Sequence, residues 1–404
     1  MLEKQKKVVN RILVWTVVGM DVLILVFYKY LGFFGDTLSA LVKIDLGIKT
    51  QLLPLGISYF TFSGISYLLD VYHRVEKPEK NILRFTSYLV MFPKLLQGPI
   101  IRYQQIKNEM ENPHFDLEET AIGVRRFVTG LAKKVLLADT FAVVAKRVLE
   151  LDPQLIGAGV AWYGLIAFSL QIYFDFSGYT DMAVGVGKMF GFKLPENFNF
   201  PYMSRSITDF WRRWHMTLTA WFRTYVFIPL EFARKRQTFL RQQTNILIVF
   251  ALTGLWHGAS WNFIIWGAYF GLILAIEASG FGKMLKTIPV FLQRFYALGL
   301  IIFGWIFFYQ MDLMDWGPFF KALFGANGWT GFENMRTLGI LGYIPIVLLG
   351  IIFSTPILKQ IETRLEIRSK TVRMVMDCGY LLVFGLVICY VLSNGFTSFL
   401  YTRF

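Results

Sequence analysis

The sequence predicts an all-α polytopic membrane protein. Of its 404 residues, 55% are hydrophobic, 17% aromatic and 17% charged, whereas soluble domains average about 25% charged residues. The mean hydropathy is +0.48. Several apolar runs approach or exceed the roughly 17–25 residues that a helix needs to cross a bilayer. We find no soluble segment, fixed-period repeat or low-complexity stretch, so we expect a single integral-membrane domain over residues 1–404.

The predicted spans follow the apolar runs in chain order. Some of the runs are short, so we expect tilted, broken or re-entrant segments among them. The runs are Ile12–Tyr28, Leu52–Leu69, Gly159–Phe174, Asn245–Trp256 joined to Trp261–Ile276, Phe295–Tyr309, Leu338–Phe353 and Tyr380–Leu392.

Residues 1–51 are predicted to form a first span and an interfacial helix. The basic segment Met1–Arg11 precedes an apolar run that is longer than a signal-peptide core, and no small-x-small cleavage site follows it. We therefore expect an uncleaved span with a cytoplasmic N-terminus. The amphipathic stretch Leu31–Lys49 is predicted to lie at the membrane interface.

The formal charge of +14 resides mostly in short segments between the apolar runs. Cytoplasmic loops of membrane proteins accumulate Lys and Arg in this way, so the charge indicates membrane lipid as a partner and argues against nucleic acid. Pro229–Gln243 is predicted to be such a loop. Asp116 and Glu119 form a helix-starting capping box, and the basic amphipathic helix after it is predicted to face anionic headgroups.

Polar residues and helix breakers interrupt the apolar runs at several points. Asp21 lies in the middle of the first span, where a lone carboxylate should face the protein interior. Two prolines and a glycine break Phe92–Ile100, which becomes a candidate cavity wall because irregular backbone at membrane depth must be buried in protein or line a cavity. Four polar residues follow within one short apolar stretch: Asp175, Ser177, Tyr179 and Asp181. Their side chains either pair with one another or line a functional path.

The stretch Phe198–His257 concentrates tryptophan, arginine and two of the four histidines. We predict one continuous helix over residues 206–223, with Asp209 in reach of Arg213. Helical periodicity would place Trp211 and His215 on one face and Arg212 and Arg223 on an adjacent face. Such a helix can frame a polar entrance, or it can be an interfacial helix held by snorkelling arginines.

His257 has almost wholly apolar neighbours. Trp256, Gly254 and Gly258 flank it, and Asn262 follows five residues later. Burial disfavours an imidazolium, so the ring should stay neutral and able to take a proton from an attacking hydroxyl. The glycines are expected to leave open space beside the ring. A buried structural histidine is the alternative.

Other catalytic designs lack their motifs. The sequence has no His-Glu-x-x-His or clustered Cys and His for zinc, no Gly-x-Ser-x-Gly elbow and no phosphate-binding Gly-rich loop. We therefore expect no metal and no bound cofactor, and the candidates for a general base are His215 and His257.

Six motifs in order resemble the membrane-bound O-acyltransferase family, in particular the branch of alginate O-acetyltransferase-like membrane subunits. They cover about residues 52–404, which would form the family core. The motifs are Pro54–Phe62, Phe92–Ile100, Phe174–Asp181, Asn197–Tyr202, Asp209–His215 and Gly254–Ala259.

The resemblance implies a ring of about 9–11 transmembrane or re-entrant helices around a tunnel. It further implies that His257 is the intramembrane catalytic histidine and that His215 is the second histidine of the site. The substrate-binding residues expected around them are Asn262, Trp211, Arg212, Arg223, Asp175, Ser177, Tyr179, Asn199 and Trp256.

The implied activity is O-acyl transfer in a bacterial inner membrane. An acetyl group would pass from cytosolic acetyl-CoA, or another acyl thioester, to an extracytoplasmic cell-surface polysaccharide or exopolysaccharide. An extracytoplasmic SGNH-type acyltransferase is the expected partner. Two alternatives stay open: D-alanyl transfer to teichoic acid by a related family member, and a transporter or flippase that uses Asp21, Asp175 and Asp181 as embedded polar sites.

Overall fold

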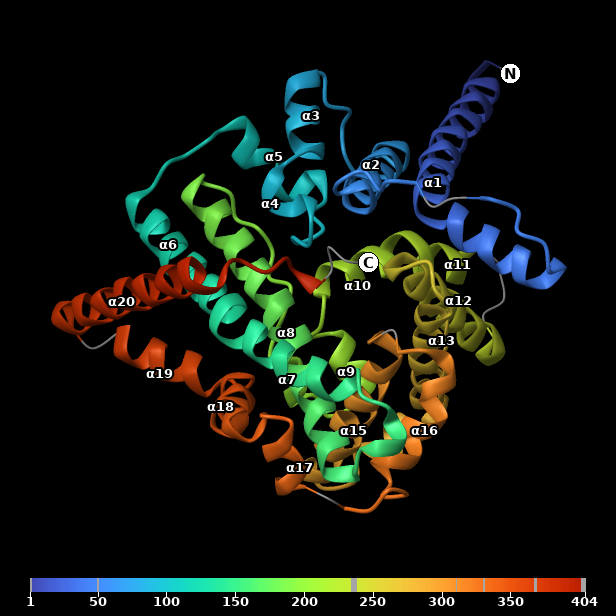
Figure 1. The fold of residues 1–404 in the computed structure, drawn as a ribbon. Helices are drawn as coiled ribbons and strands as arrows, with labels where there is room; N and C mark the ends of the chain where they lie inside the picture. Colours follow the sequence, from blue (N-terminus) through green and yellow to red (C-terminus); the bar gives the residue numbers. More distant parts are fainter. Residues whose placement is uncertain are drawn as a thin grey trace.

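The computed structural model describes residues 2–48, 51–233, 238–309, 311–329, 331–366 and 369–400. Within these ranges the chain is mostly α-helical and contains no β-strand. Figure 1 shows α1 and α2 on one side of the molecule and α15–α17 on the other, with α8 between them. The all-α prediction is confirmed.

The helices differ widely in length, from four residues to 41. The first ten are α1 (Leu2–Val42), α2 (Ile57–Tyr72), α3 (Ile82–Leu89), α4 (Phe92–Leu95), α5 (Tyr103–Glu111), α6 (Leu117–Ala132), α7 (Asp139–Leu149), α8 (Ala158–Met189), α9 (Ile207–Trp211) and α10 (Met216–Phe222). The others are α11 (Ile228–Phe232), α12 (Phe239–His257), α13 (Trp261–Ile276), α14 (Gly282–Leu285), α15 (Val290–Phe308), α16 (Leu313–Leu323), α17 (Phe332–Thr337), α18 (Ile344–Phe353), α19 (Ile357–Glu366) and α20 (Lys370–Asn394).

Helix α8 is the buried centre of the fold. It is apolar on every side, which is the pattern of a helix surrounded by other helices. Its glycines permit close packing on α6: a Cβ atom on Gly130 would lie 2.5 Å from the carbonyl oxygen of Gly178, and one on Gly185 would lie 2.6 Å from that of Gly123. The α6–α8 pair therefore depends on small residues at its interface.

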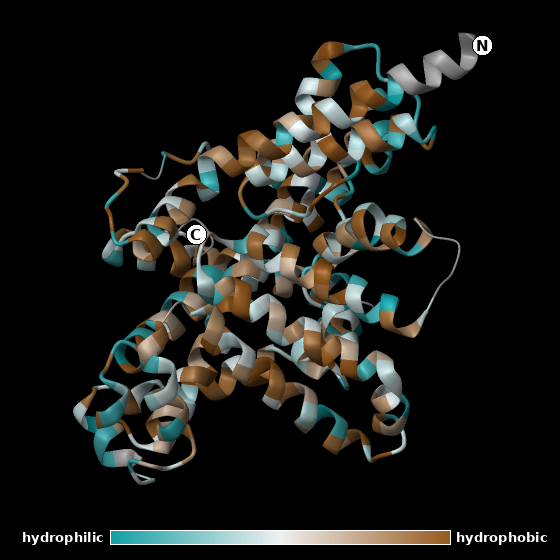
Figure 2. Ribbon diagram, turned by 90° about the vertical axis from the view of Figure 1, so that its right-hand side faces the viewer, coloured by the Kyte–Doolittle hydropathy of each residue, from teal (hydrophilic) through white to brown (hydrophobic). Residues whose placement is uncertain are grey.

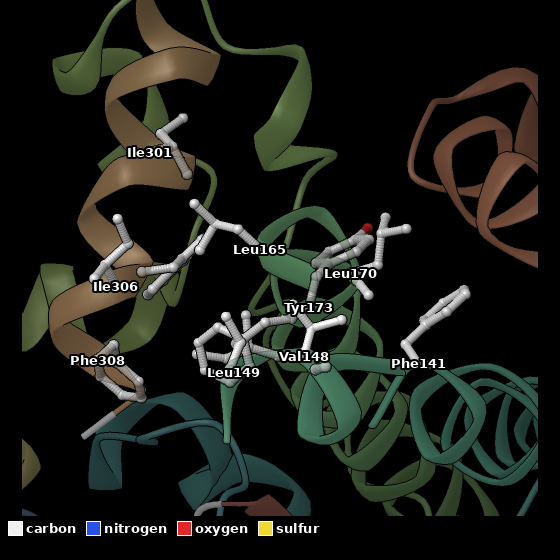
Figure 3. Close-up of a cluster of buried hydrophobic side chains, with 14 of the residues drawn as sticks. Phe141, Val148, Leu149, Leu165, Leu170, Tyr173, Ile301, Ile306 and Phe308 are labelled. Atoms are coloured by element: carbon white, nitrogen blue, oxygen red, sulfur yellow. The ribbon is translucent and has the colours of Figure 1, made fainter. Parts of the chain in front are cut away.

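The main hydrophobic core joins α7, α8 and α15. Figure 3 shows Leu165 of α8 pointing toward Ile301 and Ile306 of α15, and Phe141 of α7 belongs to the same cluster. Trp214 and Trp305 extend the core toward α9 and are almost completely buried. Since this core is large and aromatic, it gives a rigid support for the segments that carry the histidines.

Four helices in the described part of the chain are long and apolar enough to cross a membrane, and a bent pair makes a fifth. Their outward faces are rich in exposed large hydrophobic side chains. Figure 2 shows hydrophobic stretches along the helices, with hydrophilic residues more frequent near turns and helix ends. The spans are Asn10–Val42, Trp261–Leu285, Val290–Phe308 and Lys370–Asn394, with Leu341–Phe353 and Ile357–Leu365 bent by 67°.

Three predicted segments differ from the structure. Leu31–Val42 continues α1 and is not a separate helix. The span predicted to end at Phe174 runs on as α8 to Met189, because its polar residues find partners inside the protein. The span predicted over Leu52–Leu69 begins only at Ile57 in the structure. It follows Gly56, whose φ is 74°. The total of about 9–11 transmembrane or re-entrant helices and the tunnel stay predictions.

Candidate active site

His257 is the last residue of α12, at the point where the chain turns into α13. Gly258 and Gly254 both face Phe263: a Cβ atom on Gly258 would lie 2.2 Å from the Phe263 ring, and one on Gly254 would lie 2.3 Å from the Phe263 carbonyl oxygen. The expectation that these glycines leave open space beside the histidine is therefore wrong, because Phe263 fills that side. The glycines are needed because α13 packs directly against them.

Aromatic rings surround His257, whose side chain is buried. The centroid of its ring lies 4.8 Å from that of Trp256, 4.9 Å from Trp266 and 5.3 Å from Phe308. Such an environment excludes water from most of the ring and favours the neutral imidazole. This part of the prediction for His257 agrees with the structure.

His215 lies in a break between two short helices. The predicted continuous helix over residues 206–223 is wrong: α9 ends at Trp211, and His215 has left-handed backbone angles, φ 43° and ψ 53°, before α10 begins. This conformation is uncommon for a side chain of this size, and strained backbone of this kind clusters at functional sites. The turn directs His215 into the protein, where it is buried.

Asn197 orients His215, and the sequence analysis did not single it out. Its side-chain oxygen accepts hydrogen bonds from the backbone N–H and the hydroxyl of Thr217, at 3.2 and 2.9 Å. The same oxygen lies 3.1 Å from Nδ1 of His215. Because the backbone N–H of Thr217 can only donate, the Asn197 atom that it meets is the acceptor oxygen. Nδ1 of His215, which faces the same oxygen, must therefore carry the proton. Nε2 of His215 is then the nitrogen with the free lone pair.

The two histidines meet at Trp256. The ring centroids of His215 and Trp256 lie 5.9 Å apart, and His257 packs on the same indole. Trp256 also contacts Phe62 and Tyr59 of α2. The structure thus brings together three of the predicted site residues: Trp256 and His257 at the end of α12, and His215 before the start of α10.

A pocket of about 170 Å³ opens at His257 and Trp256. Its other walls are Lys29 of α1, the segment Leu53–Tyr59 and Leu96. Leu96 lies in the broken segment after α4, so the prediction that Phe92–Ile100 forms a cavity wall is confirmed.

Residues of α1 bind the end of the helix that carries His257. Lys29 donates hydrogen bonds to the carbonyl oxygens of Trp256 and His257, and Tyr30 donates one to that of Leu255. The last carbonyls of a helix have no partner within it, so these contacts complete the end of α12. Neither residue was predicted from the sequence. The available signal was a lysine directly after the apolar run Ile12–Tyr28, since a charged side chain in or beside a span usually has a polar partner.

Several predicted substrate-binding residues lie away from the pocket walls. Asn262 is buried and donates to the carbonyl of Met311, so it anchors the start of α13. Trp211 is buried against Phe250, Trp266 and Phe270. Three other predicted substrate-binding residues are exposed: Arg212, Arg223 and Asn199. The predicted pair of Asp209 and Arg213 is confirmed at 2.9 Å.

The acids of α8 are neutralised by basic residues of α6 and of the π-helical segment Lys133–Ala138 that follows it. Asp175 pairs with Lys134 at 2.9 Å and accepts a bond from the backbone of Leu400. Asp181 pairs with Lys133 and Arg126, both at 2.6 Å. The basic helix was predicted to face lipid headgroups, but these side chains face α8 because the paired charges are cheaper to bury than isolated ones.

The other polar residues of that group lie elsewhere. The Ser177 hydroxyl is buried and, among the described residues, has no hydrogen-bond partner. Tyr179 lies against the backbone of Leu96 and Gln97 and packs on Phe399. Asp21 lies near Gly64 of α2, so it faces the protein as predicted. In the residues that the structure describes, no three His, Cys, Asp or Glu side chains are grouped to hold a metal ion.

Comparison with known proteins assigns the family. The model of the membrane-bound O-acyltransferase family matches residues 14–314. A probable alginate O-acetylase AlgI of Azotobacter vinelandii is 38% identical over 83% of this chain and 70% of its own length. A peptidoglycan O-acetyltransferase of Helicobacter pylori is 33% identical over 78% of this chain and 65% of its own.

A teichoic acid D-alanyltransferase of Bacillus subtilis is 33% identical over 54% of this chain and 58% of its own length. The chain thus spans roughly two thirds of the length of these relatives or slightly less. The family match covers most of the chain and contains both buried histidines and their shared tryptophan. This protein therefore belongs to the membrane-bound O-acyltransferase family, and it is an acyl-transferring membrane enzyme.

Proposed function

We propose that this protein transfers an acetyl group from a cytosolic thioester donor, acetyl-CoA, to the hydroxyl of an extracytoplasmic cell-surface or exopolysaccharide acceptor. The observation that carries the proposal is the contact of both His257 and His215 with Trp256, where His257 and Trp256 line a pocket. The names of two relatives, an alginate O-acetylase and a peptidoglycan O-acetyltransferase, support acetyl transfer.

His257 acts as the general base in this proposal. The hydroxyl oxygen of the acceptor attacks the thioester carbonyl carbon while its proton moves to His257. The carbon–sulfur bond then breaks, and the imidazolium returns the proton to the leaving thiolate. The aromatic surroundings of His257 keep water away and so limit hydrolysis of the thioester.

His215 positions the attacking hydroxyl. Its Nε2 lone pair, fixed by the bond between Nδ1 and Asn197, can accept a hydrogen bond from the acceptor. Asn262 supports the site only indirectly, through its anchor on Met311.

The pocket supports a short acyl group. Its volume of about 170 Å³ is below the roughly 300–1,000 Å³ of sites that enclose drug-sized ligands. It can hold the acetyl thioester end of a donor, whereas the nucleotide must remain outside. The segment Pro229–Gln243, predicted to be a basic cytoplasmic loop, is the candidate to attract that nucleotide. Its Arg241 binds the carbonyls of Leu230 and Glu231, and Arg234, Lys235 and Arg236 lie outside the described residues.

The acceptor stands outside the bacterial cytoplasmic membrane in this proposal. An SGNH-type acyltransferase on that side would take the acetyl group and pass it to the polysaccharide, so the partner's hydroxyl would be the direct acceptor. The multi-pass character of the chain suits a donor and an acceptor on opposite faces.

Purified protein in lipid vesicles with labelled acetyl-CoA tests the proposal. We expect label to pass to polysaccharide, or to the partner, with the wild type and not with H257A. Unchanged label transfer by H257A would remove His257 from its role as base. Transfer from a D-alanyl carrier thioester, with none from acetyl-CoA, would favour the reaction for which the Bacillus subtilis relative is named.

The transporter alternative has lost its main support. It depended on three acids within the membrane, and two of them, Asp175 and Asp181, are paired with basic side chains. The third, Asp21, lies near Gly64 of α2. Release of free CoA in step with acetyl transfer would exclude a carrier that does no chemistry.

A further inference from the structure

Lys29 combines three properties that a helix cap alone does not need. It lies within Asn10–Val42, one of the helices long and apolar enough to cross a membrane, it lines the pocket beside His257, and it is positively charged. Among the described residues it forms no ion pair with an acidic side chain. An unpaired cation at membrane depth is costly, and where one occurs it usually serves a functional site.

The ammonium group of Lys29 has one hydrogen-bond donor left. Two of its three N–H groups are directed at the carbonyl oxygens of Trp256 and His257, the second at 3.3 Å. Its nitrogen also lies 5.9 Å from the centre of the Trp256 ring. Since Lys29 is a wall of the pocket, the remaining N–H can meet a ligand that enters there.

Tyr30 shows that capping this helix requires no charge. Its neutral hydroxyl donates to the carbonyl of Leu255, the residue before the two whose carbonyls Lys29 binds. Its side chain is buried, and Tyr30 is not a wall of the pocket. The two neighbours therefore share the capping role, and the charge and the pocket position belong to Lys29 alone.

We propose that Lys29 binds the carbonyl oxygen of the acyl thioester in this pocket and stabilises the negative charge that this oxygen gains during transfer. The inference rests on the proposed function and adds an electrophilic group to it. Donors that are fixed in place before the reaction are effective because they need no reorganisation, and a water-poor site strengthens them. The carbonyls of Trp256 and His257 fix Lys29 in this way.

The reaction balances without another reactant. As the hydroxyl oxygen bonds to the carbonyl carbon, the carbonyl electron pair moves to the oxygen, where the third N–H of Lys29 donates a hydrogen bond. When the carbonyl re-forms, the carbon–sulfur bond breaks and the thiolate takes the proton held by His257. Lys29 keeps all its protons throughout.

The test compares K29Q and K29M with Y30F in purified protein in vesicles. K29M and Y30F remove bonds to the end of α12, whereas the amide N–H groups of K29Q can still donate there. K29Q and K29M remove the charge from the pocket, and Y30F does not. Loss of one oxyanion donor lowers kcat by about 10²–10³-fold. We expect that loss in K29Q and K29M with a small change in the KM for acetyl-CoA, and kcat near the wild-type value in Y30F. K29R, which keeps the charge, should recover part of kcat.

Equal kcat losses in Y30F and K29Q, with matching losses of thermal stability, would show that Lys29 only caps α12 and would overturn the inference. Full activity of K29M would do the same. The wild type and H257A in the same assay report on the proposed function separately, because they leave Lys29 unchanged.

A second variant keeps the charge test open if K29M folds poorly. K29C is made in a background with C378S and C389S, because both native cysteines are exposed. One preparation is alkylated with 2-bromoethylamine, which restores an ammonium group, and another with iodoacetamide, which leaves a neutral amide. We expect the first to be at least about tenfold more active than the second; equal activities would contradict the proposal.

Discussion

Asn197 fixes the protonation of His215. The same side-chain oxygen of Asn197 that accepts the backbone N–H of Thr217 also faces Nδ1 of His215, 3.1 Å away. One buried amide thereby holds the histidine in a single tautomer and holds the start of α10 in place. Its effect on the site is indirect, since Asn197 is not a wall of the pocket.

N197L should disturb both functions of this amide. Removing the oxygen leaves buried donors on His215 and Thr217 without a partner, which costs about 1–3 kcal/mol, and frees His215 to change tautomer. We expect activity to fall by about tenfold or more. Nitrogen-15 NMR of labelled histidine would report the tautomer directly. N197D, which keeps an acceptor oxygen, is the control; a fixed Nδ1–H tautomer in N197L would contradict the argument.

G258A should be harmful, and a change in its neighbour should relieve it. The added methyl group would collide with the Phe263 ring, a kind of overpacking that costs about 1–3 kcal/mol. We expect lower thermal stability and activity in G258A and recovery in G258A/F263L. The collision in G254A is with the Phe263 carbonyl oxygen, so F263L should give no recovery there. Equal rescue of both glycine variants would refute this packing account.

Lys134 should matter more for stability than Asp175. Lys134 pairs with both Asp175 and Asp139, at 2.9 and 2.7 Å. Breaking a buried ion pair from one side costs about 3–5 kcal/mol. K134M leaves both acids without this partner, whereas D175N leaves Lys134 paired with Asp139. Thermal unfolding in detergent should therefore rank K134M as the less stable variant, and the reverse order would count against the network.

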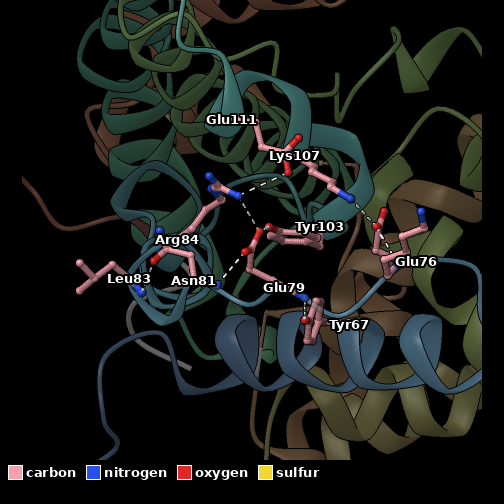
Figure 4. Close-up of polar contacts among 10 residues, drawn as sticks. Tyr67, Glu76, Glu79, Asn81, Leu83, Arg84, Tyr103, Lys107 and Glu111 are labelled. Carbon is pink, nitrogen blue, oxygen red and sulfur yellow. Dashed lines mark hydrogen bonds and ion pairs between the residues drawn. The ribbon is translucent and has the colours of Figure 1, made fainter.

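A loop outside the spans should give the protein a measurable acid sensitivity. Figure 4 shows Glu79 among Tyr103, Arg84 and Asn81. The hydrogen bond from the Tyr103 hydroxyl, with further bonds from Asn81 and Arg84, lowers the pKa of Glu79 to about 2. Because this pKa is below the unfolded value of about 4.3, the stabilisation is complete above that pH and is lost as the pH falls toward 2.

Y103F should reduce this acid sensitivity, since it removes the largest cause of the shift. The comparison is thermal stability of the wild type, Y103F and E79Q from pH 6 down to about 2. E79Q, which lacks the titrating group, serves as the control and should show the shallowest decline. If all three proteins lose stability in parallel, another carboxylate is responsible.

The sequence predicted the membrane class and the family, because composition and motif order can be read from the chain without its fold. The catalytic roles of His257 and His215 stay predictions. It did not predict the break at His215, since the residues around it have ordinary helical periodicity and the turn depends on Asn197, eighteen residues earlier. It also left open whether the acids of α8 form internal pairs or line a functional path. Only the packing of α6 on α8 decides for pairing.

The contacts between α1 and the end of α12 have a consequence for biogenesis. Lys29 and Trp256 are separated by 227 positions in the chain, so α1 leaves the ribosome long before its partner α12 is made. Contacts of this range form late in folding. The pocket beside His257 is therefore assembled only after the chain is inserted through α12, because Trp256 and His257 supply two of its walls.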